Sequence, residues 1–204
     1  MKSPPLSRPG RCEQCQRPLA RCLCPLIPSI DAACPVLILQ HHSEARHALN
    51  TARLAYLGLR GVQMWVGEQF EDLESHLAQA RQPVLLFPGE QAKVVGPMSE
   101  GEKPDLIVVP DGTWRKARLI VHSNPVLQTL PRWVLPEGEV SRYRLRKAPD
   151  PQAVSTLEAI VRVMQIMAPE QDFSPLLRPF EHLIDEQIQA MGLDTYQRNY
   201  PTST

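Results

Sequence analysis

The chain has 204 residues, of which 43% are hydrophobic and 22% are charged, and its formal net charge is zero. This size and apolar content predict one globular domain with a small appendage. A net charge of zero means that any contact with nucleic acid must come from a local basic patch. No apolar run approaches the roughly 18 residues of a membrane span, and residues 1–10 lack the apolar core of a secretory signal. We therefore expect a cytoplasmic protein.

Four cysteines lie close together near the start of the chain, in the pattern Cys-x2-Cys-x6-Cys-x-Cys. Four thiolates at this spacing suit Zn²⁺, which structural sites hold in a closed tetrahedral set of four ligands. The alternatives are free cysteines or a redox pair. The expected zinc ligands are Cys12, Cys15, Cys22 and Cys24. Cys34 stands apart from them and is expected to be a small buried side chain.

An apolar run at residues 36–39 predicts the first buried strand, and a strand-to-helix corner follows it. Ser43 is expected to cap the next helix. One face of that helix is expected to contain Ala48, Ala52, Ala55 and Leu59. His41 and His42 do not predict a metal site, because adjacent side chains face different ways on a regular element and no Asp, Glu or Cys lies at ligand spacing.

Strands and helices then alternate, which is typical of a parallel sheet with helices on its faces. Residues 62–66 predict a second strand, and residues 83–89 predict a third strand with a Pro-Gly stop. Between them, a helical face is predicted from Phe70, Leu73, Leu77 and Ala80. Pro88 and Gly89 at the stop either contact a cofactor or form a simple turn. A polar loop is expected at residues 90–104.

A fourth strand, a turn and a helix are predicted between residues 105 and 121. Residues 106–109 have the pattern of a strand buried on both faces, and Pro110 is expected to end it because proline has no N–H to donate. The apolar face of the following helix is predicted from Trp114, Ala117 and Val121. Asp111 then lies at the carboxyl end of a strand, where open α/β sheets bind ligands. The alternative is a helix-capping aspartate followed by a buried tryptophan.

Three arginines alternate along residues 141–147, where acidic residues are nearly absent. In an extended segment their side chains would share one face. Three guanidinium groups on one face suit an anionic ligand such as phosphate. The alternative is an edge strand that uses charge to prevent aggregation. These residues are Arg142, Arg144 and Arg146.

Ser155 and Glu158 have the spacing of a capping box and predict the start of another helix. That structural account is complete, although the free N–H groups of a helix start also suit an anion. The buried face of this helix is predicted from Leu157, Ile160, Val161 and Met164. A last helix is expected over residues 175–191, with a tail after it. Its apolar face is predicted from Phe180, Leu183, Ile184 and Ile188.

Several blocks, in this order, resemble the DTW-domain family of tRNA-uridine aminocarboxypropyltransferases, which is related to the SPOUT class. The cysteine quartet is the first block. The second is the corner formed by His41, Glu44, Arg46, Asn50, Thr51, Leu54 and Ala55, in which His42 stands where the family has a proline. The third is the sequence Asp111-Gly112-Thr113-Trp114. The last combines Tyr143, Leu145 and Arg146 with Ser155-Thr156-Leu157-Glu158-Ala159.

The resemblance implies a SPOUT-like, knotted α/β core with a mostly parallel sheet, helices on both faces and a small N-terminal zinc module. It also implies the domain organisation. Residues 1–34 are expected to form a leader and the four-cysteine zinc module, residues 35–192 the catalytic domain, and residues 193–204 a C-terminal tail.

The implied reaction transfers the 3-amino-3-carboxypropyl group of S-adenosylmethionine to N3 of a tRNA uridine, in the variable loop, and releases 5′-methylthioadenosine. Uridine N3 must lose its proton, which requires a base or an orienting carboxylate, and Asp111 is the candidate. The alternatives are a SPOUT-type RNA methyltransferase and a non-catalytic, zinc-braced RNA-binding module. The expected partners are tRNA and S-adenosylmethionine, and no obligate protein partner is indicated.

The expected site residues fall into three groups besides the zinc ligands. The catalytic group is Asp111, Thr113 and Trp114, although a core tryptophan is an equal alternative at position 114. The cofactor-binding group is Pro88, Gly89, Asp111, Gly112, Ser155, Thr156 and Glu158. The RNA-binding group is Arg46, Arg115, Arg118, Arg142, Arg144 and Arg146.

Overall fold

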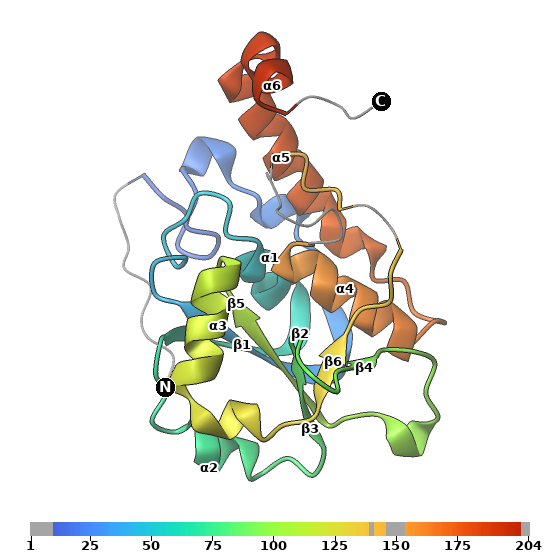
Figure 1. The fold of residues 1–204 in the computed structure, drawn as a ribbon. Coiled ribbons are helices and arrows are strands. Elements are labelled where there is room, and N and C mark those ends of the chain that lie inside the picture. The colour runs from blue at the N-terminus through green and yellow to red at the C-terminus, as the bar shows by residue number, and fades with distance from the viewer. Residues whose placement is uncertain (1–9, 139–140, 146–153, 201–204) are drawn as a thin grey trace.

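The structure is a computed structural model that describes residues 10–138, 141–145 and 154–200. Within these residues, a six-stranded sheet has the order β2-β1-β5-β3-β6-β4, and every neighbouring pair is parallel (Figure 1). The strands are β1 Ile30–His41, β2 Leu59–Gly67, β3 Pro83–Leu86, β4 Lys93–Val94, β5 Leu106–Asp111 and β6 Arg132–Val134. The predicted parallel α/β sheet is confirmed. β1 starts inside the segment that the sequence assigned to the N-terminal module.

Strands β1 and β5 lie side by side in the middle of the sheet. All of β5 is buried, and β1 is buried over residues 36–41. Unbroken apolar runs of this kind are typical of parallel strands that are covered on both faces. β5 continues past Pro110, since Gln40 of β1 pairs with Asp111. The prediction that Pro110 ends the strand is therefore wrong, because a proline removes one donor from the ladder and the next residue can still pair.

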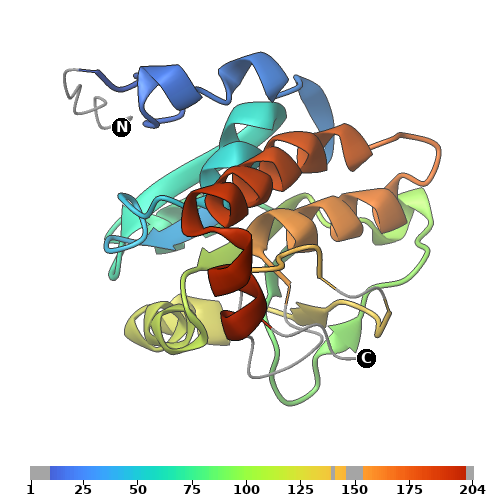
Figure 2. The same cartoon turned by 90° about the horizontal axis from the view of Figure 1, so that it is seen from above.

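Helices cover both faces of the sheet (Figure 2). They are α1 Thr51–Gly58, α2 Leu73–Leu77, α3 Trp114–Ser123, α4 Thr156–Met167, α5 Arg178–Met191 and α6 Leu193–Asn199. One hydrophobic core joins α1, α4 and α5 to the face of the sheet that contains Val36 and Ile107. A second core joins α2 and α3 to the opposite face, which contains Leu37 and Val108. The expected two-sided arrangement is confirmed.

The local signals in the sequence identify most helices correctly. Ser155 and Glu158 form both bonds of the capping box at the start of α4. The four residues predicted for the buried face of α4 and the four predicted for α5 are all buried. Short 3₁₀ turns occupy Leu19–Arg21, Cys24–Leu26, Glu100–Glu102, Pro125–Gln128 and Ser174–Leu177. The segment predicted as a C-terminal tail contains α6, which begins after Gly192.

The first helix starts later than its sequence suggested. Asn50, not Ser43, is the N-cap of α1, and its side chain accepts a hydrogen bond from the Arg53 amide at 3.0 Å. Residues 42–47 form turns instead, with the Glu44 amide donating to the His41 carbonyl. The Ser43 hydroxyl, which is the group that could cap a helix, lies instead 2.9 Å from Nδ1 of the His41 ring. An alternative local partner of this kind competes with helix capping.

The carboxyl ends of β1 and β5 mark the point where the chain changes direction across the sheet. From β1 the chain continues to β2 on one side, while β5 and β3 lie on the other. Ligands of open parallel sheets bind at such a switch point.

None of the helices in the part of the chain that the structure describes combines the length and the apolar composition of a membrane span.

Phe180 of α5 provides a test of the packing on the face of the sheet that α1, α4 and α5 cover. It is fully buried, and its ring meets the Tyr143 ring edge-on at 5.4 Å. We expect Phe180→Ala to lower the free energy of unfolding by about 3–5 kcal/mol, because the truncation leaves a cavity. Leu193→Ala is the control, since Leu193 is exposed and its loss should cost no more than about 0.5 kcal/mol. Equal urea midpoints for the two variants would contradict the packing described here.

Candidate active site at the carboxyl ends of the central strands

Asp111 lies at the carboxyl end of β5, and its carboxylate is buried. Gln40 of β1 donates its amide Nε2 to Asp111 Oδ2 at 2.8 Å. The hydroxyl of Thr156, at the start of α4, donates to Asp111 Oδ1. Two donors from different segments therefore hold one carboxylate at the switch point. Thr156 and Asp111 come from separate sequence blocks, and the fold brings them into direct contact.

The hydrogen-bonded network continues from Asp111 toward α1 and α3. The Gln40 amide also donates to Asn50 Oδ1 at 3.0 Å, and Asn50 Nδ2 donates to the Glu44 carbonyl at 3.1 Å. The Glu44 carboxylate then accepts from Lys116 Nζ of α3 at 2.7 Å. Gln40 and Lys116 were not among the predicted site residues. Their contacts join segments far apart in the sequence, which local patterns do not encode.

The turn between β5 and α3 needs glycine at position 112. Gly112 has a φ of +154°, and a Cβ there would lie 2.9 Å from Lys116 Cβ and 3.6 Å from His41 Cβ. L-residues rarely adopt this backbone conformation. The cap of α3 is Thr113, whose hydroxyl accepts from the Lys116 amide. Asp111 is therefore not the capping residue that the alternative interpretation required.

Trp114 occupies the first turn of α3 and is half-buried. Its ring lies 5.9 Å from the ring of Phe87, which follows β3, and it packs against the second hydrophobic core. The structure thus gives Trp114 a packing role. Its remaining exposed surface is free for a stacking contact, which is the role that the sequence suggested.

Glu158 of α4 is buried and acts as a structural anchor. Its carboxylate accepts from the Ser155 amide at 2.8 Å, from the Ser141 hydroxyl at 2.9 Å and from the Arg142 amide at 2.6 Å. A buried carboxylate requires donors of this kind. Glu158 therefore fixes residues 141–142 against the start of α4. Ser155 is equally buried, and its hydroxyl accepts from the Glu158 amide.

Pro88 and Gly89 lie beyond the end of β3 and are exposed. Arg132 of β6 donates Nη1 to the Pro88 carbonyl at 3.0 Å. A Cβ on Gly89 would lie 2.8 Å from Arg132 Cδ, so the guanidinium arm lies directly over this turn. No local pattern predicts this place for Arg132, because its position depends on the pairing of β6 with β3.

The predicted arginine face is wrong in its geometry. Residues 141–145 turn instead of extending, with the Arg144 amide donating to the Arg142 carbonyl. α5 supplies the acidic partners that the local sequence lacks, because Arg142 pairs with Glu181 and Arg144 with Asp185. Arg146 lies outside the described residues. The other predicted RNA contacts, Arg46, Arg115 and Arg118, are exposed.

His41, His42 and Glu68 form a cluster that the sequence did not predict. Their ligand atoms lie within 4.8 Å of one another, so the expectation that no carboxylate reaches the histidines is wrong. Glu68 follows Gly67, which pairs with His41 across the parallel ladder. The Ser43 amide donates to His41 Nδ1, so in the neutral ring Nε2 carries the proton and faces Glu68 at 3.4 Å. The pairing of β1 with β2, and not the spacing of residues along the chain, brings Glu68 to the two histidines.

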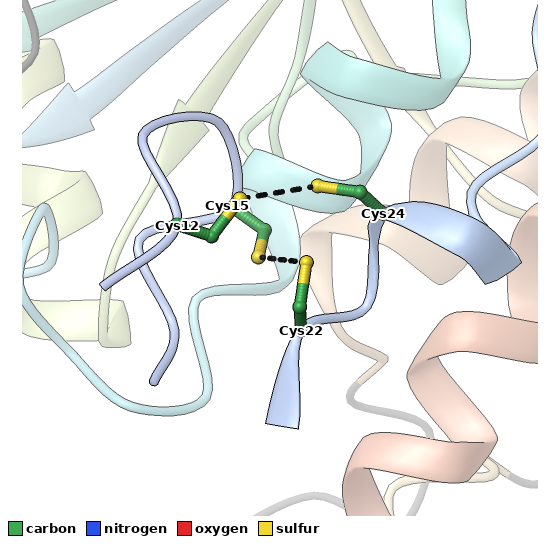
Figure 3. A group of neighbouring side chains, drawn as sticks. All are labelled: Cys12, Cys15, Cys22 and Cys24. Atoms are coloured by element: carbon green, nitrogen blue, oxygen red, sulfur yellow. Dashed lines mark hydrogen bonds between the residues drawn. The ribbon is translucent and has the colours of Figure 1, made fainter. Parts of the chain in front are cut away.

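The four cysteines of the quartet converge at one point (Figure 3). The sulfurs of Cys12 and Cys24 are 3.5 Å apart, and those of Cys15 and Cys22 are 3.7 Å apart. Zn–S bonds of about 2.3 Å in a tetrahedron require sulfurs about 3.8 Å apart, so the spacing fits zinc. The pKa of the Cys12 thiol is lowered to about 7, chiefly by the backbone at Cys15, whereas burial raises the pKa of Cys24.

Two half-buried arginines lie between the cysteine cluster and the rest of the molecule. Arg53 of α1 donates Nη2 to the Ala45 carbonyl at 3.0 Å, and burial lowers the pKa of its guanidinium. The Cys15 thiolate acts on that pKa in the opposite direction. Arg17 pairs with Glu186 of α5. The contact between Arg17 and Glu186 has no local sequence signal, because it joins the N-terminal module to a helix near the other end of the chain.

The profile of the DTW domain matches residues 10–188. The chain belongs to the DTW domain family. The match includes the cysteine cluster, the Asp111 network and most of α5, so the site described above lies within the part of the chain that the family shares.

Curated relatives of this DTW protein come from animals and plants. One from Drosophila melanogaster, named tRNA-uridine aminocarboxypropyltransferase 2, is 28% identical over 96% of this chain and 82% of its own length. The Mus musculus protein of the same name is 29% identical over 89% of this chain and 65% of its own length. An Arabidopsis thaliana relative named tRNA-uridine aminocarboxypropyltransferase A is 27% identical over 78% of this chain and 73% of its own length. No solved structure gives a significant match.

Cys34 provides a test of burial in β1, one of the two central strands. It is buried in β1, its thiol donates to the Pro104 carbonyl at 3.1 Å, and burial raises its pKa to about 12. The raised pKa keeps the thiol protonated until the pH approaches that value, and only the thiolate is nucleophilic. We expect iodoacetamide at neutral pH to leave Cys34 unmodified in the folded protein and to modify it after unfolding, as peptide mass spectrometry will show. Modification at the same rate in both states would contradict this burial.

Proposed function

We propose that this DTW protein is a tRNA-uridine aminocarboxypropyltransferase that uses S-adenosylmethionine as the donor. One observation carries the proposal. The Asp111-Gly112-Thr113-Trp114 block and the Ser155-Thr156 block meet at the carboxyl ends of the central strands, where Thr156 donates to the Asp111 carboxylate. The names of the curated relatives give the reaction class.

In the proposed reaction, N3 of the uridine attacks the methylene carbon that links the aminocarboxypropyl arm to sulfur. The C–S bond breaks, its electron pair stays on sulfur, and 5′-methylthioadenosine leaves. The N3 proton must pass to a base before or during the attack. The sulfonium activates three carbons, so the choice of carbon depends on how the enzyme positions N3 relative to the arm.

Asp111 is the proposed partner of the uridine N3–H group. Gln40 and Thr156 fix the carboxylate in one orientation, which is the preorganisation that an orienting group needs. Gly112 brings the backbone close to the ligand, and the exposed part of Trp114 is proposed to stack on the adenine or the uracil. Pro88, Gly89 and the start of α4 at Ser155 are proposed to line the donor pocket.

We propose that tRNA phosphates lie over α3 and the corner before α1. Arg46, Arg115 and Arg118 are exposed there. Arg142 and Arg144 would have to exchange their carboxylate partners on α5 for phosphate. Binding through several phosphates should weaken steeply with added salt. A uridine of the variable loop remains the proposed target, and the cytoplasm the proposed location.

We also propose that the core is knotted in the SPOUT manner and that the four cysteines hold a structural Zn²⁺. The parallel sheet with helices on both faces supports the first point. The connection from β6 to α4 includes residues 139–140 and 146–153, which lie outside the described residues. The sulfur spacing supports the second point. Zinc bound by four cysteines has no open coordination position, so its contribution would be to the fold.

The reaction class can be tested with unmodified tRNA and two batches of S-adenosylmethionine, one labelled in the carboxyl carbon and one in the methyl carbon. We expect label in RNA from the carboxyl batch alone, because the transferred arm carries that carbon. Label from the methyl batch alone would identify a methyltransferase. Binding of tRNA without transfer of either label would indicate a non-catalytic RNA-binding module.

Asp111→Asn tests the role of the carboxylate. We expect transfer to fall by at least about a hundredfold, because an amide cannot accept the N3 proton or orient it as a carboxylate does. This substitution is cleaner than Asp111→Ala, which would leave the buried Thr156 hydroxyl without its acceptor.

Asp105→Asn is the matched control for this test. Asp105 lies at the opposite end of β5, where it accepts from the Arg81 and Gln82 amides. We expect it to retain wild-type transfer. Equal rates for Asp111→Asn and the wild type, in folded protein, would rule out the proposed role.

Cys24→Ser tests the zinc site. We expect wild-type protein to contain one zinc per chain and Cys24→Ser to lose most of it, because a serine hydroxyl is a poor ligand beside three thiolates. Elemental analysis by mass spectrometry measures the metal content of each protein. Cys34→Ala is the control and should retain zinc, since Cys34 lies apart from the cluster. Zinc retained in full by Cys24→Ser would contradict the assignment.

A further inference from the structure

Glu44 and Lys116 form an ion pair beside the candidate site. Lys116 Nζ lies 2.7 Å from Glu44 Oε1, and the two side chains are 23% and 18% exposed. The pair is therefore largely shielded, yet it is open to solvent on one side. A charged pair in this position has to be stabilised by its surroundings or used for binding.

The fold fixes both partners beside Asp111. The Lys116 backbone is tied to Thr113, which caps α3, and Lys116 Cβ lies against the bare Cα of Gly112. The Glu44 backbone is tied to Asn50, which is bonded in turn to Gln40, and Gln40 donates to Asp111. The pair thus lies on the same hydrogen-bonded network as the proposed catalytic carboxylate, just beyond the Asp111-Gly112 turn.

The arm that the proposed reaction transfers carries a matching pair of charges. Its α-carbon bears an ammonium and a carboxylate, which lie side by side at the far end from the sulfonium. A lysine and a glutamate in contact can exchange partners with such a zwitterion. The lysine takes the carboxylate and the glutamate takes the ammonium, so no buried charge is left unpaired.

We propose that Lys116 binds the α-carboxylate and Glu44 the α-ammonium of S-adenosylmethionine, and that this pair selects which carbon is transferred. The inference rests on the proposed function and deepens it. Holding the far end of the arm beside Asp111 places the methylene carbon, not the methyl group, opposite the uridine. Selection among three activated carbons is a matter of position, and two charged contacts fix the arm at its end.

Three probes separate this role from a purely structural one. S-adenosylmethionine carries both charges of the arm, decarboxylated S-adenosylmethionine keeps the ammonium alone, and 5′-methylthioadenosine lacks the arm. We expect the wild-type full chain to bind S-adenosylmethionine about tenfold or more tighter than its decarboxylated form in titration calorimetry, since an ionic hydrogen bond is lost.

Lys116→Met removes the charge and keeps most of the side-chain stem. We expect it to bind the two charged probes with nearly equal affinity and to bind 5′-methylthioadenosine as the wild type does. Glu44→Gln should weaken both charged probes and spare 5′-methylthioadenosine. Lys93→Met, on the exposed edge strand β4, is the matched control and should change none of the three affinities.

Two results from the variants would overturn the inference. One is that either variant binds S-adenosylmethionine as tightly as the wild type, and the other is that it weakens all three probes by the same factor, as a structural defect would. A wild-type chain that binds S-adenosylmethionine and transfers its arm to tRNA, but fails to prefer it over the decarboxylated form, would overturn the inference alone. A wild-type chain that binds none of the three probes would overturn the proposed function as well.

Discussion

The Asp111 carboxylate joins the two central strands of the sheet to the start of α4. A buried carboxylate is stable only where donors replace water. Here the donors come from Gln40 at the end of β1 and from Thr156 at the start of α4. These two residues are more than a hundred positions apart in the sequence. The bonds can form only when β1 and β5 are in register and α4 is docked, so the site and the fold depend on each other.

The N-terminal cysteine cluster is connected to the corner before α1 through Arg53. Arg53 lies close to the cluster and donates to the Ala45 carbonyl within the corner that carries Glu44 and Arg46. The half-buried Arg53 guanidinium would partly balance the net negative charge of the four-thiolate zinc site that we propose. Arg53 therefore connects the cysteine cluster to the corner that precedes α1.

Local sequence patterns were sufficient for the features that depend on local chemistry. The double-sided burial of β5, the capping box at Ser155 and the apolar faces of α4 and α5 follow from residue spacing, and the structure has them. Local sequence patterns did not predict the contacts whose partner lies in a distant segment of the chain. α5 supplies Glu181 and Asp185 to the arginines of residues 141–145, and Gly67 pairing brings Glu68 to His41. Asn50 caps α1 in place of Ser43, whose hydroxyl lies 2.9 Å from Nδ1 of the His41 ring.

Recognition of the family motifs supplied what spacing alone did not. The sequence of Asp111-Gly112-Thr113-Trp114 places a carboxylate at a strand end, but only the resemblance connected it with Ser155 and Thr156. In the structure, the hydrogen bond from Thr156 to Asp111 joins the two blocks. Asn50 belongs to a family block that the sequence shows, whereas the contacts of Gln40 and Lys116 are visible only in three dimensions.

The identity of the nucleoside by-product shows whether the protein transfers the aminocarboxypropyl arm and whether Asp111 is needed for that transfer. Wild-type protein and Asp111→Asn would be incubated with unmodified tRNA and S-adenosylmethionine, and the released nucleoside separated by chromatography. We expect 5′-methylthioadenosine to form in step with RNA modification for the wild type and to be nearly absent for Asp111→Asn. Formation of S-adenosylhomocysteine, or an unchanged yield of 5′-methylthioadenosine from folded Asp111→Asn, would contradict this expectation.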